Sequence, residues 1–148
     1  MLRLYRSVAD VTTPVLVQMP VHLVDATVAL TVLLVYRSDI DPSLSLRFSC
    51  REGICGSCAV LINGRPGLAC LHWLQRHDLL AVSPLSHFAV VRDLVVDLTV
   101  LYGQYALVRP WLAYDAATVG SVAHRVLLEG HYECILCCTC VSGCPSYW

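Results

Sequence analysis

Charged side chains are scarce in this 148-residue sequence, and lysine is absent altogether. The charged fraction is 14%, against about 25% in an average soluble domain, and all ten basic residues are arginine. With a formal net charge of −1, the chain lacks the basic surface of a nucleic-acid-binding protein, so we expect no nucleic-acid partner. We give the missing lysine no functional interpretation, and a biased base composition is the simplest explanation.

A hydrophobic run long enough to cross a membrane is also missing. The longest apolar run, Ala26–Tyr36, lies between Asp25 and Arg37 and is shorter than the roughly 20 residues a span needs. The first residues have neither the apolar core of a signal peptide nor the length of a transit peptide. The hydrophobic fraction is nevertheless 57%, so we expect apolar surface to be buried against other subunits.

Cysteine is abundant instead, with nine residues in two tight groups, Cys50–Cys70 and Cys134–Cys144. A disulfide framework is typical of small secreted chains, and the number is odd. Structural zinc uses two C-x2-C pairs some 15–20 residues apart, whereas the pairs here are much farther apart. Cysteines two or three residues apart in turns favour chelation of a metal cluster.

The first group has the spacing C-x4-C-x2-C…C, which plant-type ferredoxins use to bind [2Fe–2S]. Its members are Cys50, Cys55, Cys58 and Cys70. Such a loop must wrap closely around a compact inorganic core. Gly53 and Gly56 permit positive φ and let backbone amides approach the sulfurs.

The second group reads C-x2-C-x2-C-x3-C-P, a run in which three cysteines serve one cluster and the fourth serves another. It consists of Cys134, Cys137, Cys140 and Cys144, followed by Pro145. No further cysteine in the sequence completes either ligand set. Cys138 is out of step with this spacing and is predicted to be a packed thiol, and the six histidines show no metal-binding spacing.

The secondary-structure pattern changes along the chain from strands to helices. A hairpin is expected around Asn63-Gly64, a strong tight-turn signal, and it would return Cys70 to the first cysteine loop. Ala26–Tyr36 is ambiguous, because its β-branched residues favour a strand while Asp25 could cap a helix. The expected strands are Leu2–Tyr5, Leu16–Val24, Ser45–Ser49, Ala59–Ile62, Leu68–Cys70 and Leu79–Ser83.

Helical periodicity begins at Asp93, the predicted N-cap, and this helix should end at Arg109-Pro110. Its expected apolar face is formed by Leu94, Leu98, Leu101, Tyr102 and Tyr105. A second helix is expected over Thr118–Glu129, stopped by Gly130. The change from the β-rich to the helical part therefore falls near residues 92–106.

Beyond the motifs, the chain resembles the family of iron–sulfur subunits of succinate dehydrogenase, respiratory complex II. The likeness covers nearly the whole length, with both cysteine motifs in order. The stretches that carry it are SCREGICGSC at 49–58, LAC at 68–70, PLSHFAVVRDLVVDL at 84–98 and ECILCCTCVSGCPSY at 133–147.

The resemblance implies an α+β fold in two parts. Residues 1–92 would form a β-grasp domain of the plant-type [2Fe–2S] ferredoxin kind, with Asp25–Tyr36 helical. Residues 93–148 would form the first half of an α-helical ferredoxin domain. His87 matches a family position near the interface of the two domains.

The resemblance also implies the ligands. Cys50, Cys55, Cys58 and Cys70 would hold [2Fe–2S]; Cys134, Cys137 and Cys140 would hold [4Fe–4S]; and Cys144 would serve [3Fe–4S]. The remaining cysteines would come from the missing C-terminal half of the subunit, and our leading hypothesis is that this half is a separate chain. Ubiquinone would lie near Pro145, Ser146 and Trp148.

In that family, electrons pass from FADH2 through the three clusters to ubiquinone, and the subunit has no substrate chemistry of its own. The implied partners are an FAD-containing flavoprotein, the separate chain and membrane anchor subunits. The expected location is the matrix side of the mitochondrial inner membrane, or else the cytoplasmic side of a bacterial inner membrane. Three alternatives stay open: a fumarate reductase subunit, a stand-alone two-cluster ferredoxin and a non-functional fragment.

Overall fold

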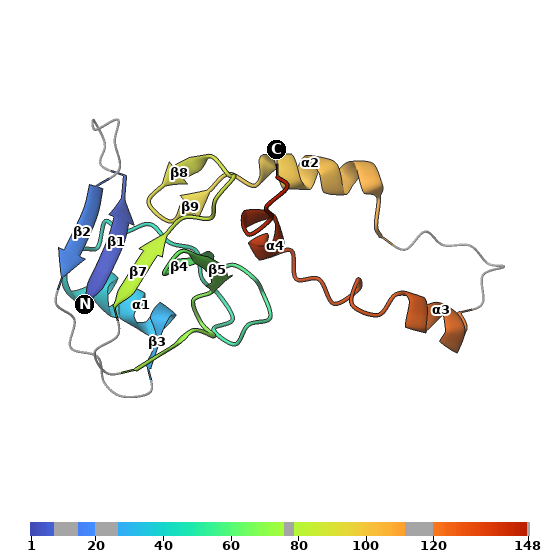
Figure 1. The fold of residues 1–148 in the computed structure, drawn as a ribbon, viewed down its shortest axis with the longest axis horizontal. Coiled ribbons are helices and arrows are strands. Elements are labelled where there is room, and N and C mark those ends of the chain that lie inside the picture. Colours follow the sequence, from blue (N-terminus) through green and yellow to red (C-terminus); the bar gives the residue numbers. More distant parts are fainter. Residues whose placement is uncertain (8–14, 20–26, 76–78, 112–119, 148) are drawn as a thin grey trace. The chain divides into compact units, whose positions relative to one another are not determined.

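The computed structural model describes residues 1–7, 15–19, 27–75, 79–111 and 120–147 (Figure 1). The chain forms two compact units. The first comprises Met1–Asp97 together with Cys137–Trp148, and the second comprises Leu98–Leu136. We call Cys137–Trp148 the C-terminal cysteine segment, and it thus packs with the N-terminal part of the chain. The predicted assignment of residues 93–148 to half of an α-helical ferredoxin domain stays a prediction.

A mixed five-stranded sheet forms the centre of the first unit, with strand order β2-β1-β7-β4-β5. The central pair, β1 and β7, is parallel, and the other pairs are antiparallel. The strands are β1 Leu2–Arg6, β2 Val15–Met19, β4 Ala59–Ile62, β5 Arg65–Leu68 and β7 Leu80–Ser83. Strand β1 buries every second residue, as a strand with one core-facing side should.

The hairpin of β4 and β5 confirms the turn expected at Asn63-Gly64. Both turn residues have positive φ, 51° and 79°, the values of a type I′ turn whose twist matches the strands. Leu68 pairs with Ala59 at the open end of the hairpin, which brings the chain back beside the first cysteine loop. The expected strand Leu68–Cys70 was wrong beyond Leu68, because β5 ends there and Ala69 and Cys70 lie in a turn.

Helix α1, Ala29–Asp39, resolves the ambiguity of this segment in favour of the helix implied by the family resemblance. Its buried residues are Ala29, Leu30, Val32, Leu33 and Tyr36, a helical spacing that packs into one core with β1, β4 and β7. The exposed or half-exposed positions between them are also apolar or β-branched. The buried and exposed faces of the helix therefore differ little in polarity, which is why the sequence alone did not identify a helix here. Asp25 lies outside the described residues, and the N-cap is Val28.

The first amides of α1 are satisfied by the chain that follows β5. Ala29 N–H donates to the carbonyl of His72 at 2.9 Å, and Leu30 N–H donates to that of Ala69, also at 2.9 Å. A helix start leaves such amides without intrahelical partners, so these bonds replace a side-chain cap. Nearby, β3 Thr27–Val28 pairs with β6 Trp73–Leu74.

Two predictions for the rest of this unit were wrong. Ser45–Ser49 has no regular secondary structure and is not a strand. Asp93 is not a helix N-cap, because it occupies the turn between β8 Val90–Arg92 and β9 Val95–Val96, with a φ of 49°. Leu94 is accordingly buried in the core of the first unit and does not lie on a helix face.

The second unit contains two helices within its described residues, α2 Thr99–Val108 and α3 Val122–Leu127. The predicted stop of α2 is confirmed, since Arg109 ends it in the left-handed conformation before Pro110. Helix α3 starts later than predicted, with the Ser121 hydroxyl accepting from the His124 amide at 3.2 Å, and part of the predicted range lies outside the described residues.

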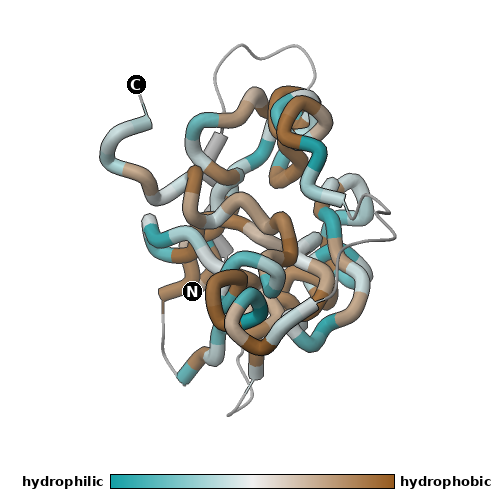
Figure 2. The backbone as a smooth tube through the Cα atoms, turned by 90° about the vertical axis from the view of Figure 1, so that its right-hand side faces the viewer, coloured by the Kyte–Doolittle hydropathy of each residue, from teal (hydrophilic) through white to brown (hydrophobic). Residues whose placement is uncertain are grey.

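Neither helix of the second unit buries a residue within the described part of the chain. Figure 2 shows hydrophobic positions along both helices, interrupted by hydrophilic ones. The most exposed apolar side chains are Val100, Leu107, Val108, Val122 and Leu127. Among the described residues, no helix combines the length and hydropathy that crossing a membrane requires.

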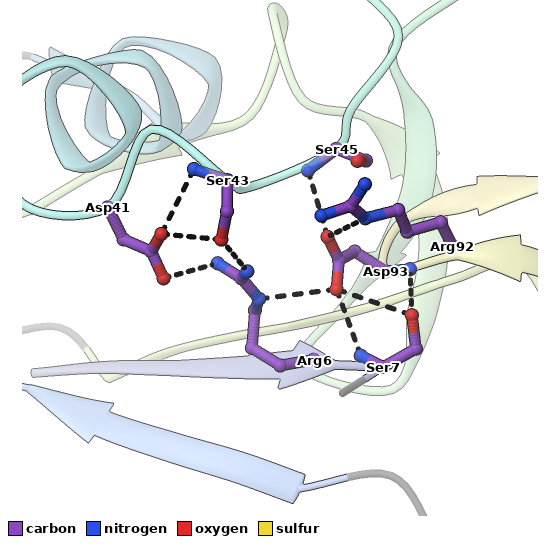
Figure 3. Close-up of polar contacts among 7 residues, drawn as sticks. All are labelled: Arg6, Ser7, Asp41, Ser43, Ser45, Arg92 and Asp93. Carbon is purple, nitrogen blue, oxygen red and sulfur yellow. Dashed lines mark hydrogen bonds and ion pairs between the residues drawn. The ribbon is translucent and has the colours of Figure 1, made fainter. Parts of the chain in front are cut away.

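A buried polar network ties the first unit together (Figure 3). The Asp93 side chain is 0% exposed and accepts the amides of Ser7 and Ser45, both at 2.9 Å. Arg6 Nε lies 3.2 Å from Asp93 Oδ1, without the N–H direction of a hydrogen bond, so this contact is an ion pair. In return, the Asp93 amide donates to the Ser7 hydroxyl at 2.7 Å.

Arg6 extends this network to the loop after α1. Its Nη1 lies 2.8 Å from Asp41 Oδ2, and its Nη2 donates to the Ser43 hydroxyl at 2.6 Å. Hydrogen bonding by Ser43, followed by the charge of Arg6, lowers the pKa of Asp41. Because the folded pKa is the lower one, the associated stabilisation is present above the ordinary pKa of aspartate and lost as the pH falls.

We expect Asp93→Ala to lower the free energy of unfolding by about 3 kcal/mol, because it leaves the Arg6 guanidinium buried beside an empty site. Urea denaturation of the cluster-loaded protein followed by circular dichroism measures this. Asp39→Asn is the matched control, since Asp39 is exposed, and should change the value by less than about 0.5 kcal/mol. Equal effects of the two substitutions would contradict a central role for Asp93.

Candidate metal centre

The first cysteine loop, residues 50–58, is wound so that backbone amides face the Cys50 sulfur. The amides of Glu52, Ile54 and Cys55 donate to Cys50 Sγ at 3.4, 3.3 and 3.3 Å. This path requires left-handed backbone at Arg51, with φ 65°, and at Gly53, with φ 82°. The predicted role of Gly53 in bringing amides to sulfur is thereby seen in the geometry.

Cys50 and Cys55 form the first pair of thiols. The Cys50 amide donates to Cys55 Sγ at 3.5 Å, and Cys55 N–H in turn donates to Cys50 Sγ. A side-chain hydrogen bond from Ser57, followed by backbone hydrogen bonds, lowers the pKa of Cys55 to about 6. The loop therefore favours the thiolate, the form of cysteine that binds metal.

Cys58 and Cys70 form the second pair, which is more deeply placed, with each residue 5% exposed. Burial raises the pKa of Cys58 to about 11, and the neighbouring Cys70 side chain adds to the rise. The β4–β5 hairpin brings the two together, since the Ala69 amide donates to the Cys58 carbonyl at 3.1 Å. A bound cation would reverse this preference for the neutral thiols.

Cys70 is held in place by its neighbours on both sides. The carbonyls of Ala69 and His72 accept the first two amides of α1, so the turn that carries Cys70 is fixed to the start of this helix. The hydrophobic core thereby determines where the fourth thiol lies. Sequence spacing alone did not indicate this link between α1 and Cys70.

The contacts group the four thiols into two pairs, Cys50 with Cys55 and Cys58 with Cys70. Two pairs of thiols would suit a cluster of two irons with two protein ligands on each. Within the described ranges, no three His, Cys, Asp or Glu side chains surround a position for a single metal ion. All nine cysteines are described, and none is in a disulfide. Amide hydrogen bonds to sulfur, as at Cys50, are also a usual means of tuning the potential of such a cluster.

Leu71 covers the cysteine loop, a contact that sequence reasoning missed. A Cβ atom on Gly53 would lie 2.7 Å from Leu71 Cδ1, well inside van der Waals contact. Leu71 directly follows Cys70, so its side chain lies over the loop because the hairpin returns there. Gly53 therefore suits the positive φ of the loop, and a larger residue there would also have to displace the exposed end of the Leu71 side chain.

The second cysteine group is divided between the two units. Cys134 is exposed and belongs to the second unit, whereas Cys137, Cys140 and Cys144 belong to the first. A short helix, α4 Thr139–Ser142, carries Cys140 and leads to Cys144. Cys137 Sγ lies 3.2 Å from the Thr139 hydroxyl.

The remaining predicted residues of this region are Cys138 and the three residues predicted to lie near ubiquinone, Pro145, Ser146 and Trp148. Cys138 is buried, as a packed thiol would be, and has a φ of 64° at the N-cap of α4. Pro145 and Ser146 are exposed, and Trp148 lies outside the described residues. The structure brings Cys137, Cys140 and Cys144 onto one unit, and their role as ligands stays a prediction.

The fold and the cysteine loop define a ferredoxin-type protein that binds an iron–sulfur cluster. Residues 1–102 match the model of the family described as the 2Fe-2S iron-sulfur cluster binding domain. This match covers more than half of the chain, which therefore belongs to that family.

Two relatives that the chain resembles are iron–sulfur subunits of succinate dehydrogenase. The chain is 49% identical over 127 residues to the succinate dehydrogenase [ubiquinone] iron-sulfur subunit 1, mitochondrial, of Oryza sativa subsp. japonica, covering 80% of this chain and 45% of the relative. It is 44% identical over 126 residues to the succinate dehydrogenase iron-sulfur subunit of Paracoccus denitrificans, covering 80% and 48%. The chain thus spans about half the length of these relatives.

A solved structure shows the same fold. The chain is similar to a chain of the Mycobacterium smegmatis Sdh1 complex in the apo form, with a TM-score of 0.82 and 28% identity. The match covers 97% of this chain and 62% of that one. The resemblance to iron–sulfur subunits of succinate dehydrogenase and the expected α+β fold are both confirmed.

We expect Gly53→Ala to reduce the content of iron and acid-labile sulfide, because the new methyl group meets Leu71 and the backbone is held at positive φ. Gly64→Ala is the matched control, since Gly64 has a similar φ of 79° but nothing within 4 Å of its Cβ position. It should cost about 1 kcal/mol of stability and leave the cluster content unchanged.

The double substitution Gly53→Ala with Leu71→Ala distinguishes the effect of the contact with Leu71 from the effect of the positive φ. It removes the side chain that the new methyl group meets, so part of the cluster content should return. Metal analysis and visible absorption of the purified protein compare these three variants with the wild type. A loss in the double variant as large as in Gly53→Ala would show that contact with Leu71 is not the cause.

Proposed function

We propose that this chain is the electron-transfer iron–sulfur subunit of a succinate:ubiquinone oxidoreductase. The observation that carries the proposal is the loop at 50–58, which sets two pairs of thiols in the fold shared with succinate dehydrogenase subunits. Cys50, Cys55, Cys58 and Cys70 are proposed as the ligands of [2Fe–2S]. When bound, such a cluster accepts and releases one electron at a time.

The residues of this chain act on that electron transfer by ligation, hydrogen bonding and exclusion of water. The amides of Glu52, Ile54 and Cys55 stabilise negative charge on the Cys50 sulfur. The core buries Cys58 and Cys70, and Leu71 covers Gly53. These residues supply no acid–base or nucleophilic step, so succinate oxidation takes place elsewhere, on the FAD of a flavoprotein partner.

The second cysteine group supports two further clusters in this proposal. Cys134, Cys137 and Cys140 would provide three ligands of [4Fe–4S], and Cys144 one ligand of [3Fe–4S]. The remaining ligands would lie in the part of the subunit that corresponds to the rest of the relatives' length. Ubiquinone would lie beside Pro145, Ser146 and Trp148.

The other partners follow from the same assembly. The exposed apolar side chains of α2 and α3 suit burial in a complex with the separate chain and the membrane anchor subunits. The subunit would sit peripherally on the matrix side of the mitochondrial inner membrane, or on the cytoplasmic side of a bacterial one. Succinate oxidation is the proposed direction.

The decisive experiment is electron paramagnetic resonance of the complex purified through a tag on this chain. We expect signals of three cluster types and co-purification of a flavoprotein and of a chain that supplies further cysteines. Cys58→Ser should remove the [2Fe–2S] signal and at least nine-tenths of the succinate:quinone activity. Cys144→Ser should alter the [3Fe–4S] signal.

Cys138→Ser is the matched control for these substitutions, because Cys138 is adjacent to a proposed ligand but out of step with its spacing. It should leave all three signals in place. A single [4Fe–4S] cluster held by all four cysteines from 134 to 144, on a chain that purifies alone, would instead identify a stand-alone ferredoxin and refute the proposal.

A further inference from the structure

The C-terminal cysteine segment is attached to the first unit by side chains that the metal chemistry does not use. The Ser86 amide donates to the Ser142 hydroxyl at 2.9 Å, and the Tyr147 hydroxyl donates to the His87 carbonyl at 3.0 Å. The rings of His87 and Tyr147 are stacked, with centroids 4.0 Å apart and planes 17° from parallel. Two neighbouring residues, Ser86 and His87, thus contact the segment at two positions, Ser142 and Tyr147.

The contact at Ser142 is buried. This side chain is 6% exposed and lies at the end of α4, which packs beside β5. On the same side, a Cβ atom on Gly143 would lie 3.1 Å from Pro66 Cγ, so the backbone approaches the β4–β5 hairpin closely. The segment is therefore held by the hairpin that also returns Cys70 to the first loop.

His87 has an unusual backbone conformation that favours this contact. Its φ is 70°, a value that non-glycine residues adopt rarely and at a cost in free energy. The turn that includes His87 presents its carbonyl and its ring to Tyr147. The ring stack and the hydrogen bond offset this cost at the position where the segment is attached.

We propose that Ser86, His87, Ser142 and Tyr147 form a clamp that fixes Cys140 and Cys144 on the [2Fe–2S] domain, with all four acting as positioning residues. Cys144 is two residues after Ser142 and three before Tyr147, so it is anchored on both sides. Metal ligands need support of this kind, because small displacements of a ligand change the properties of its site. The identity of the cluster at Cys144 rests on the proposed function.

The test uses the intact complex and two readouts other than activity. Hydrogen exchange followed by mass spectrometry reports on the amides of residues 139–144, and electron paramagnetic resonance reports on the cluster at Cys144. Tyr147→Ala should speed exchange of this segment about ten-fold, because both the stack and the hydrogen bond are lost. It should also broaden or shift the [3Fe–4S] signal while leaving that of [2Fe–2S] unchanged.

Three further variants distinguish a positioning role from general damage to the fold. Tyr147→Phe keeps the stacked ring and loses only the hydroxyl, so it should restore the wild-type [3Fe–4S] signal. His124→Ala is the control for His87→Ala, since His124 is an exposed histidine on the second unit. The control should change neither readout, whereas His87→Ala should behave like Tyr147→Ala.

Two results would overturn the clamp: unchanged exchange in Tyr147→Ala, or faster exchange with an unchanged [3Fe–4S] signal. A wild-type complex without a cluster at Cys144 would contradict the proposed function instead. In that case hydrogen exchange alone decides whether the segment is clamped. Failure of the clamp and failure of the proposed function can therefore be told apart.

Discussion

The buried carboxylate of Asp93 is the contact on which the first unit depends most. It joins strand β1 through Ser7 and Arg6, the chain that leads to the cysteine loop through Ser45, and the β8–β9 turn through its own backbone. A fully buried charge is costly unless nearly all of its hydrogen-bonding capacity is used. Here two backbone amides, the Ser7 hydroxyl and the guanidinium groups of Arg6 and Arg92 surround it (Figure 3). These segments can therefore occupy only the arrangement that keeps Asp93 paired.

This constraint also affects the metal centre. The segment 41–49 has no sheet partner, so its path is set by Arg6 at residues 41 and 43 and by Asp93 at residue 45. It enters the loop at Cys50 from there. At the other end, the turn with Cys70 is fixed to the start of α1. The two pairs of thiols are thus placed by contacts far from the sulfur atoms.

The sequence predicted the features that depend on local chemistry. The Asn63-Gly64 turn and the glycine at 53 follow from residues that tolerate positive φ, and both were found. Asp93 was misassigned because an aspartate before an apolar periodic stretch looks like an N-cap, whereas its partners lie 48 and 86 residues away in the chain. Leu71 and the His87–Tyr147 stack were missed for the same reason, since pairings between distant residues have no local signature.

The two units differ in what stabilises them. The first has a continuous core of leucine, valine and alanine side chains from the sheet and α1, and it carries the cysteine loop. The second has helices of ten and six residues that bury nothing within the described part of the chain. Isolated helices of this length are marginal in water, so their stability must come from packing of their apolar side chains. The scarcity of charge in the sequence agrees with the proposed burial of these side chains in a complex, because a surface that a partner covers does not need charged side chains to remain hydrated.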